Sequence, residues 1–446
     1  MNFSETAGEI LSRTLHRGIE NAEVYLLSSR ATTIEVKDQK VDAFISANIR
    51  GAGLRVIEEG RAGFAFAALS DGSEIDALVQ HAVTAAKFTE PDSHNCLPGP
   101  TEIPDVDLQL FDSGIAAVPE EEKIARAMTL EQTARERDSR IKVVRKAATH
   151  DSEYHVHLLN SRGVDLSFSG TSCSASIMVM ADDGTHQEMG WDSDFHRTFS
   201  GLDVRKIGRR GADNALQLLG AKAVPTCNVK VLLTPLTAVG FLEVLAAPFS
   251  ANAVQKEKSL FKDRVGEKVA ASTFQLVDNG LLPGGAGTAP FDDEGVPMQC
   301  KHLIRNGVLQ GYLHNCYTAD RAGESSTGNG MRNGYAGMPH VGTTNLYIEA
   351  GDLTEEELLR KMDRGLLVTE VMGMHTANPV SGDFSVGVSG LWVEKGRVTH
   401  PVRGGAMAGN LIDLLKKIEG IGSDIRFYGS IGSPTLLIGN LSLSGA

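Results

Sequence analysis

The stretch Val229–Pro248, VKVLLTPLTAVGFLEVLAAP, decides how the second half of the chain folds. Val229–Leu233 is short, β-branched and aliphatic, which predicts a buried strand. Thr234 is a favourable N-cap and Pro235 suits the first helical position, so a helix follows the strand directly. Because this helix is apolar on every side, we expect it to be buried on every side, with Glu243 as its one ionisable side chain.

A carboxylate on a buried helix is either paired structurally or used in chemistry. The residues alone favour the structural interpretation, in which a Lys, an Arg or a backbone N–H pairs with Glu243. In zinc peptidases such a helix carries two histidines about one turn apart, with a glutamate beside the first. Here Leu242 precedes Glu243 and Ala247 lies a little over one turn further on, so no metal ligand surrounds the carboxylate.

The composition is typical of a soluble globular protein with an acidic surplus. Its 446 residues predict two or three domains, and 41% of them are hydrophobic and 22% charged. The formal net charge of −13 makes nucleic-acid binding unlikely, because such binding needs a basic face. The N-terminus lacks a signal-peptide pattern, no run of 18 apolar residues occurs, and the five dispersed cysteines predict reduced thiols. We therefore expect a cytoplasmic protein without membrane association.

The order of elements predicts an α+β fold. The N-terminal half should consist of antiparallel β meanders flanked by helices, because the order helix, meander of five short strands, helix occurs twice before residue 220. The C-terminal half should be a β-rich domain with a buried central helix and two hairpins. The expected helices of the first half span residues 4–17, 73–88, 119–137 and 203–219, and the expected hairpins span 299–318 and 383–402.

We expect a domain boundary in the stretch 221–228. The N-terminal domain would then span 1–222 and the C-terminal domain 223–446. The N-terminal domain could consist of two similar units, at about 1–90 and 118–222. Only the order of helices and strands is repeated between them, and the amino-acid sequence is not.

Two other groups of polar residues carry little functional signal. His155 and His157 share one face of a strand and could begin a metal site, but we interpret them as the polar face of a solvated sheet. Ser325 and Ser326 lie in a Gly/Ser/Asn-rich loop that lacks the residue order of a phosphate-binding loop. No G-x-S-x-G nucleophile turn occurs between a strand and a helix.

Cys300, His302, His314 and Cys316 contain the residue types of a zinc site. A two-residue turn at Asn306-Gly307 would put the first pair and the second pair on opposite faces of a hairpin. A three-residue turn would separate Cys316 from His302 by roughly 20 Å along the ladder. We therefore predict that the four side chains do not share one ion.

Several long strings in the second half resemble the TldD/PmbA proteins, once called modulators of DNA gyrase. The resemblance covers essentially the whole chain and is densest after residue 225. The strings that carry it are NPVSGDFSVGVSGLWVE at 378–394, PVRG at 401–404, AGNL at 408–411, SPTLLI at 433–438 and NLYI at 345–348.

This resemblance implies a metallopeptidase system. In such families the TldD-like subunit carries His-Glu-x-x-x-His on the helix after the first strand of the C-terminal half, and a later cysteine completes a zinc site. Here Leu242, Glu243 and Ala247 occupy the three motif positions, and the stretch Phe427–Ile431, where the cysteine would fall, contains none. Because all three metal ligands are missing, the chain resembles the PmbA (TldE) type, the non-metal partner of a TldD-like subunit.

The resemblance implies a partner subunit in a cytoplasmic heteromeric protease that cleaves peptides or unfolded proteins. We expect no cofactor in this chain and zinc in the TldD-like partner, with this chain providing chamber walls and peptide docking. The strand 383–388 could pair with an extended peptide, which makes Asn378, Ser381, Asp383 and Ser385 the candidate peptide-binding residues. Glu243 would then be a remnant or a structural acid.

Two alternatives remain. The chain could be a stand-alone homo-oligomer, such as a homodimer, that binds or cleaves peptides by non-zinc chemistry, with Glu243 and either His314 or His340 as acid and base. It could also control gyrase or nucleic acid directly, but the acidic charge balance makes this the least attractive alternative.

Overall fold

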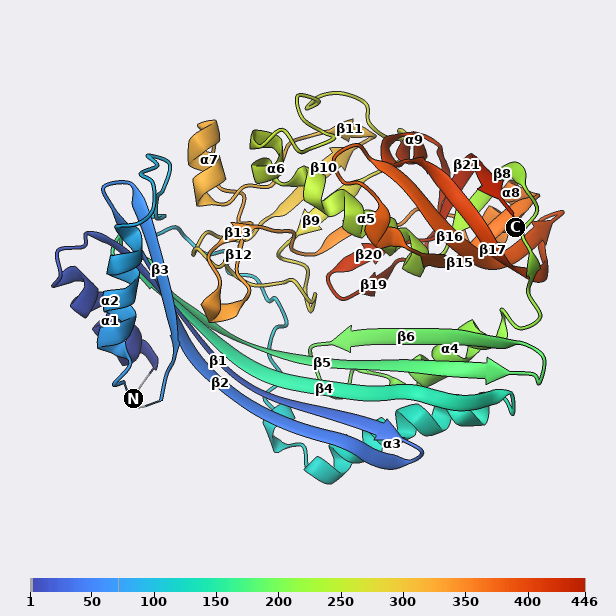
Figure 1. Cartoon of the computed structure of the whole chain (residues 1–446), viewed down its shortest axis with the longest axis horizontal. Coiled ribbons are helices and arrows are strands. Elements are labelled where there is room, and N and C mark those ends of the chain that lie inside the picture. The colour runs from blue at the N-terminus through green and yellow to red at the C-terminus, as the bar shows by residue number, and fades with distance from the viewer. Residues whose placement is uncertain (1–2, 71, 446) are drawn as a thin grey trace.

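The N-terminal half of the chain is built on one long antiparallel sheet (Figure 1). The computed structural model describes residues 3–70 and 72–445, and it orders the six strands of this sheet as β3-β2-β1-β4-β5-β6. Both meanders therefore join one continuous sheet, because β1 pairs with β4 along most of its length. The strands are β1 (Asn21–Lys37), β2 (Lys40–Glu58), β3 (Arg61–Ala68), β4 (Ile141–Asn160), β5 (Asp165–Asp182) and β6 (Gln187–His196).

The expectation of five short strands in each meander is wrong, since each contains three strands of which two are long. β1 runs unbroken through the polar segment Ser28–Arg30, because that segment pairs with β2 on one side and β4 on the other. Two complete hydrogen-bond ladders outweigh the weak local preference of these residues for a turn.

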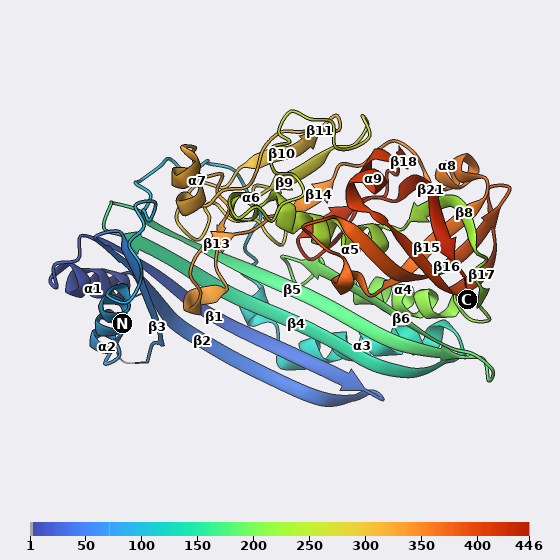
Figure 2. The ribbon, with the colours of Figure 1, turned by 45° about the horizontal axis from the view of Figure 1, so that its top comes forward.

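Four helices cover the sheet near the positions predicted for them. α1 and α2 pack at the end where β1 begins, and α3 and α4 pack at the opposite end, each pair with its own apolar core (Figures 1 and 2). The helices are α1 (Phe3–Leu15), α2 (Ile75–Ala86), α3 (Glu120–Arg137) and α4 (Val204–Leu216).

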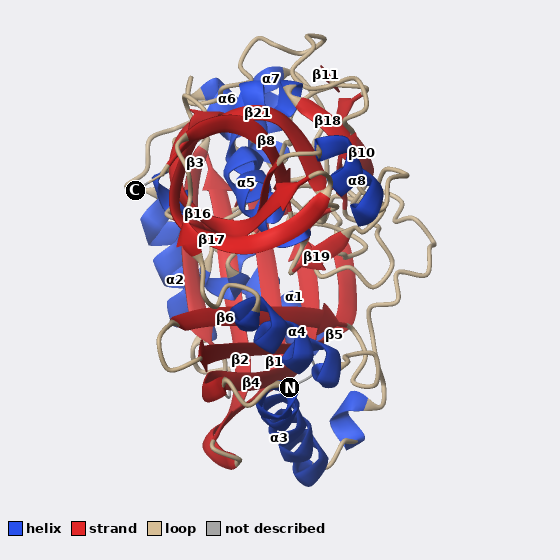
Figure 3. Ribbon diagram, turned by 90° about the vertical axis from the view of Figure 1, so that its right-hand side faces the viewer, coloured by secondary structure: helices blue, strands red, loops and turns tan. Residues whose placement is uncertain are grey.

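A closed five-stranded barrel forms the centre of the C-terminal half. Each of its strands pairs with the next, and β21 closes the ring by pairing with both β17 and β8. Seen along the barrel, α5 (Pro235–Ala246) lies within the outline of the ring (Figure 3). The strands in order around the ring are β8 (Cys227–Leu233), β15 (Gly365–Met372), β16 (Asp383–Glu394), β17 (Arg397–Asn410) and β21 (Leu436–Ser444).

A second sheet lies beside the barrel, in the order β11-β10-β9-β14-β20-β19. Its strands are β9 (Leu276–Asn279), β10 (Cys300–Arg305), β11 (Val308–Leu309), β14 (Leu346–Ile348), β19 (Arg426–Tyr428) and β20 (Ile431–Ser433). The remaining elements are β7 (Lys222–Ala223), α6 (Ala251–Gln255), α7 (Cys316–Ala322), β12 (Gly330–Met331), β13 (His340–Val341), α8 (Glu355–Met362), α9 (Leu411–Lys416) and β18 (Ile418–Ile421), with short 3₁₀ turns η1 (Ile115–Ala117), η2 (Ala247–Phe249), η3 (Gly334–Ala336) and η4 (Met374–Thr376).

The two predicted hairpins had different outcomes. β16 and β17 form the second hairpin as expected, with its turn between Glu394 and Arg397. The first hairpin has the expected turn at Asn306-Gly307, but its second strand ends at Leu309. The chain after it becomes α7 instead of strand, because Asn315 caps that helix with a complete capping box.

Buried ion pairs tie the two halves of the molecule together. Arg55 on β2 contacts Glu23 on β1 through Nη2 at 2.9 Å, and its Nη1 lies 3.0 Å from Glu294 of the C-terminal half. Arg332, also from the C-terminal half, pairs with Glu23. All four side chains are buried. The division into domains at 222/223 stays a prediction. Within the described residues, every helix is too short or too polar to cross a membrane.

Candidate functional site

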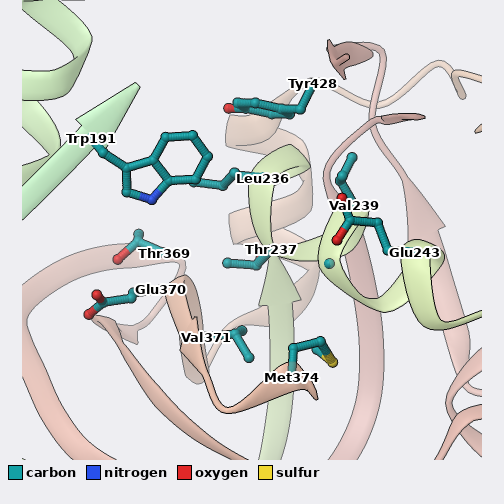
Figure 4. Close-up of a pocket in the computed structure, with 11 residues that line it drawn as sticks. Trp191, Leu236, Thr237, Val239, Glu243, Thr369, Glu370, Val371, Met374 and Tyr428 are labelled. Atoms are coloured by element: carbon teal, nitrogen blue, oxygen red, sulfur yellow. The ribbon is translucent and has the colours of Figure 1, made fainter. Parts of the chain in front are cut away.

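The candidate site is a cavity of about 280 Å³ where the N-terminal sheet meets the barrel (Figure 4). Its lining comes from β6, α5, β15, η4 and β19, so both halves of the chain build it. The residues that line it are Trp191, Leu236, Thr237, Val239, Gly240, Glu243, Thr369, Glu370, Val371, Met374 and Tyr428.

The local sequence explains how α5 reaches this cavity. β8 ends at Leu233, Thr234 is the extended N-cap residue, and Pro235 occupies the first turn of the helix, as predicted. Phe241 and Leu242 of this helix pack in the barrel core. The expectation that α5 is buried on every side is wrong, because its other face is turned to the cavity and to solvent.

Glu243 lies on that open face. Within the described part of the chain it forms neither an ion pair nor a hydrogen bond, so the structural pairing favoured by the sequence is absent there. Its side chain reaches solvent, yet enough of the carboxylate lies in the cavity that burial raises its pKa. An unpaired carboxylate in this setting is available to a ligand.

A second carboxylate, Glu370 on β15, also lines the cavity. Burial raises its pKa and so does the nearby Glu188, while a hydrogen bond with Ser389 acts in the opposite direction. The preceding residue, Thr369, contributes a buried Oγ1 that has no hydrogen-bond partner among the described residues. The β15 side of the cavity is therefore polar, and among the described residues it includes a hydroxyl group without a hydrogen-bond partner.

Two aromatic rings also line the cavity (Figure 4). Trp191 of β6 and Tyr428 of β19 make an edge-to-face contact with ring centroids 6.1 Å apart. Trp191 is 41% exposed, whereas burial raises the pKa of Tyr428 to about 12. Arg426 lies over the Tyr428 ring and donates a hydrogen bond of 2.7 Å to its hydroxyl group.

The residues present do not fit a zinc ion. No histidine or cysteine lines the cavity, and residues 3–70 and 72–445 contain no group of three or more His, Cys, Asp or Glu arranged to hold a metal. Of the two histidine positions of the family motif, Leu242 is packed in the core and Ala247 is exposed. Tyr428 lies in the stretch where the resemblance expects a cysteine, and the fold does bring that stretch to α5.

The histidines considered as partners of Glu243 lie elsewhere. His314 is buried just before α7, where its ring Nδ1 lacks a partner in the described residues and burial lowers its pKa. His340 is exposed on β13. Neither residue lines the cavity that contains Glu243, so the structure does not bring either acid–base pair together there.

The predicted peptide-binding residues lie at the start of β16 and in the turn before it. Asn378, Ser381, Asp383 and Ser385 are all exposed. Asn378 Oδ1 accepts a hydrogen bond of 2.8 Å from the Val380 backbone, and Asp383 Oδ1 accepts one from the Asn410 amide. These two side chains therefore stabilise the turn itself.

Strand 383–388 has an open side only in its first part. Residues 383–386 pair with β17 alone, whereas Gly387 and Val388 pair with both β17 and β15. On the open side, the Asp383 carbonyl group accepts a hydrogen bond from the backbone N–H of Asn378. The Ser385 carbonyl group accepts one from the Thr376 hydroxyl group. A peptide added as a strand would have to replace these two bonds, and its docking there stays a prediction.

The remaining polar groups from the sequence are structural. His157 is buried and contacts Asp165 at 2.7 Å, and His155 packs against the Phe3 ring, so the expectation of a solvated histidine face is wrong. Cys300 pairs with Asn279 in the second sheet while Cys316 begins α7, so the candidate zinc set does not assemble.

Sequence reasoning missed Trp191, Glu370 and Tyr428. Glu370 had a usable signal, because it is a lone carboxylate in the apolar strand GLLVTEVM, just as Glu243 is a lone carboxylate on an apolar helix. Trp191 had none, since nothing in its local sequence relates it to α5, whereas Tyr428 lies in the stretch 427–431 that the resemblance had already related to that helix.

Three family models match consecutive parts of the chain. The PmbA/TldA metallopeptidase domain 1 matches residues 22–86, the central domain matches 114–219 and the C-terminal domain matches 226–445. The fold and the matches define a chain of metallopeptidase architecture. It belongs to the PmbA/TldD metallopeptidase family, which confirms the resemblance identified from its sequence.

Individual relatives agree with this assignment. Metalloprotease PmbA of Escherichia coli O157:H7 is 28% identical, and the match covers 96% of this chain and 92% of that protein. A Thermotoga maritima structure assigned as a candidate modulator of a DNA gyrase superposes with a TM-score of 0.91 at 27% identity, over 99% of this chain and 100% of that one. TldE from Thermococcus kodakarensis, at 24% identity, shares the fold with a TM-score of 0.90 and the same coverage.

Proposed function

We propose that this chain is a PmbA/TldE-type subunit that acts with a metal-bearing TldD-like chain in the proteolysis of peptides or unfolded proteins. Its own part would be to form chamber walls and dock peptides. The observation that carries this proposal is the α5 cavity, which keeps the helix and Glu243 but has no imidazole or thiolate. A catalytic zinc site needs three protein ligands, and two carboxylates of the cavity do not supply such a set.

A free sheet edge supports the need for a partner. Among the described residues, residues 40–49 of β2 pair with β1 on one side only, because β3 and the residue after it pair from Arg50 onward. Large apolar side chains are exposed along this edge, namely Val41, Phe44, Ile45 and Ile49. Exposed apolar edge strands tend to associate with another chain, so this segment is a suitable subunit interface. A TldD-like chain or a second copy could cover it.

The proposal is tested by purifying the chain alone and together with a TldD-like chain. We expect the complex to contain stoichiometric zinc and to cleave unfolded peptide substrates, and we expect the isolated chain to do neither. Metal analysis and a peptide-cleavage assay, each with and without a chelator, provide the readouts. Stoichiometric zinc in this chain alone would overturn the proposal.

One observation favours a stand-alone peptidase as the second candidate. Among the described residues Glu243 has no partner, and its pKa is raised, which suits a carboxyl group that exchanges protons. On this alternative the isolated chain would cleave peptides and Glu243→Gln would abolish the cleavage. Full activity of that variant, or an inactive wild-type chain, would exclude Glu243 as its acid or base.

A further inference from the structure

We propose that the cavity binds a cationic group of a peptide, an ammonium or a guanidinium, between the carboxylates of Glu243 and Glu370 and the ring of Trp191. This inference names the ligand chemistry of the docking role and therefore rests on the proposed function. The two carboxylates come from different elements, α5 and β15, and lie on opposite sides of the cavity (Figure 4).

The first argument is an excess of negative charge. Glu243 has no partner among the described residues, and Glu370 has only the Ser389 hydroxyl group. The charged group that acts on Glu370 is another carboxylate, Glu188, which lies 2.6 Å from Arg403 and is neutralised by it. No Lys or Arg is among the residues that line the cavity.

Two arginines close to the cavity, Arg426 and Arg210, are already paired. Arg426 contacts the buried Asp192 at 2.8 Å and also donates to the Ser193 carbonyl group. Arg210 lies 4.0 Å from Asp194. Their charges are therefore offset by neighbouring carboxylates, and the two glutamates of the cavity remain without a counter-charge. A bound cation would supply it.

The second argument is the chemistry of the other walls. Tyr428 already has a guanidinium over its ring, whereas the more exposed Trp191 ring can take a second cation over its face. The unpartnered Oγ1 of Thr369 is a hydrogen-bond acceptor, and both ammonium and guanidinium groups offer only donors. At about 280 Å³ the cavity is at the small end of ligand sites, which suits one side chain or one chain end.

Trp191 provides a direct probe of binding. The chain contains two tryptophans, and the other, Trp392, is buried in the barrel. We would titrate the purified full chain with four tripeptide amides and follow tryptophan fluorescence. The four are acetyl-Ala-Arg-Ala-amide, Ala-Ala-Ala-amide with a free amino terminus, acetyl-Ala-Ala-Ala-amide and acetyl-Ala-Glu-Ala-amide. The first two distinguish a basic side chain from a chain terminus.

We expect saturable binding of at least one of the two cationic peptides and of neither other peptide. Glu243→Gln and Glu370→Gln should each weaken it roughly two- to fivefold. Glu356→Gln, on the exposed face of α8 and outside the cavity, is the matched control and should change nothing. Binding to the wild-type chain should also weaken as salt is raised, which tests the charge argument without any variant.

Equal binding of the cationic and neutral peptides would overturn the inference, as would unchanged affinity in both cavity variants. The test uses this chain alone, so its failure leaves the zinc and cleavage test of the partner role untouched. Conversely, a cation site in a chain that never associates with a TldD-like protein would support the inference while the proposed function fails.

Discussion

Arg55 joins the two halves of the molecule through buried ion pairs. It contacts Glu23 of its own sheet and Glu294 of the other half, and all three side chains are buried. Removing one member of a buried ion pair leaves an uncompensated charge, which costs about 3–5 kcal/mol. We therefore expect Arg55→Met to lower the free energy of unfolding by that order, measured by urea denaturation.

Arg13→Met is the matched control for this change. Arg13 pairs with Glu9 and Asp76 at the surface, where water already solvates the charges, so its loss should have little effect. If Arg55→Met unfolded at the same urea concentration as the wild type, the buried cluster would contribute nothing to stability.

Asp192 makes stability depend on pH. Burial raises its pKa from 3.8 to about 6, although Arg426 acts in the opposite direction. The folded state then binds the proton more tightly than the unfolded state, so the stabilisation is complete below about pH 4 and is lost as the pH rises through 6. The loss should amount to roughly 3 kcal/mol.

Asp192→Asn should remove this contribution to the pH dependence. Near pH 7 the variant lacks the charged partner of Arg426, whereas below pH 6 the wild-type Asp192 is itself neutral, so the slope and not the absolute value is informative. We expect unfolding free energies measured from pH 4 to 7 to fall less steeply in the variant. Parallel profiles would show that Asp192 does not titrate in this range.

At the scale of elements, α5 divides its faces between core and cavity. Leu242 is 1% exposed within the barrel core, whereas Ala247 is exposed at the end of the helix. The face that would carry the first histidine of the family motif is therefore filled by a packed leucine. This packing explains why the helix can persist without the metal.

Histidine substitutions at these two positions should consequently behave differently. Leu242→His would bury an imidazole without an apparent partner and should cost about 2–4 kcal/mol of unfolding free energy. Ala247→His places the same side chain in solvent and should change stability little, so it serves as the control. Urea unfolding of both variants provides the comparison. Equal stabilities would mean that the 242 position opens to the cavity.

At the scale of the whole molecule, the free edge of β2 determines how the chain can assemble. Ile45 is 55% exposed there, beside unpaired backbone groups. We expect Ile45→Lys to leave the stability of the folded chain unchanged and to weaken association, with a partner or a second copy, on the order of tenfold or more. Light scattering and co-purification measure both forms of association.

Val265→Lys is the control for that variant. Val265 is 51% exposed in a loop away from the β2 edge, so a lysine there should leave assembly intact. Undiminished assembly of Ile45→Lys would place the interface on another surface.

The sequence by itself determined the family and those local features that depend on a few neighbouring residues. The start of α5 followed from Thr234 and Pro235, and the β16–β17 turn followed from its residues, because capping and turn preferences act over a few positions. The long strands were not predictable in this way. The segment Ser28–Arg30 becomes strand only because two distant segments pair with it.

Only the tertiary structure decided the composition of the site. The sequence singled out Glu243 and the stretch Phe427–Ile431, but not Trp191 or Glu370. Nor could it show that α5 has an open face, since the apolar pattern of the helix is the same whether one side faces core or cavity. The physical reason is that a cavity depends on which elements pack together, and packing brings together side chains whose local sequences carry no record of one another.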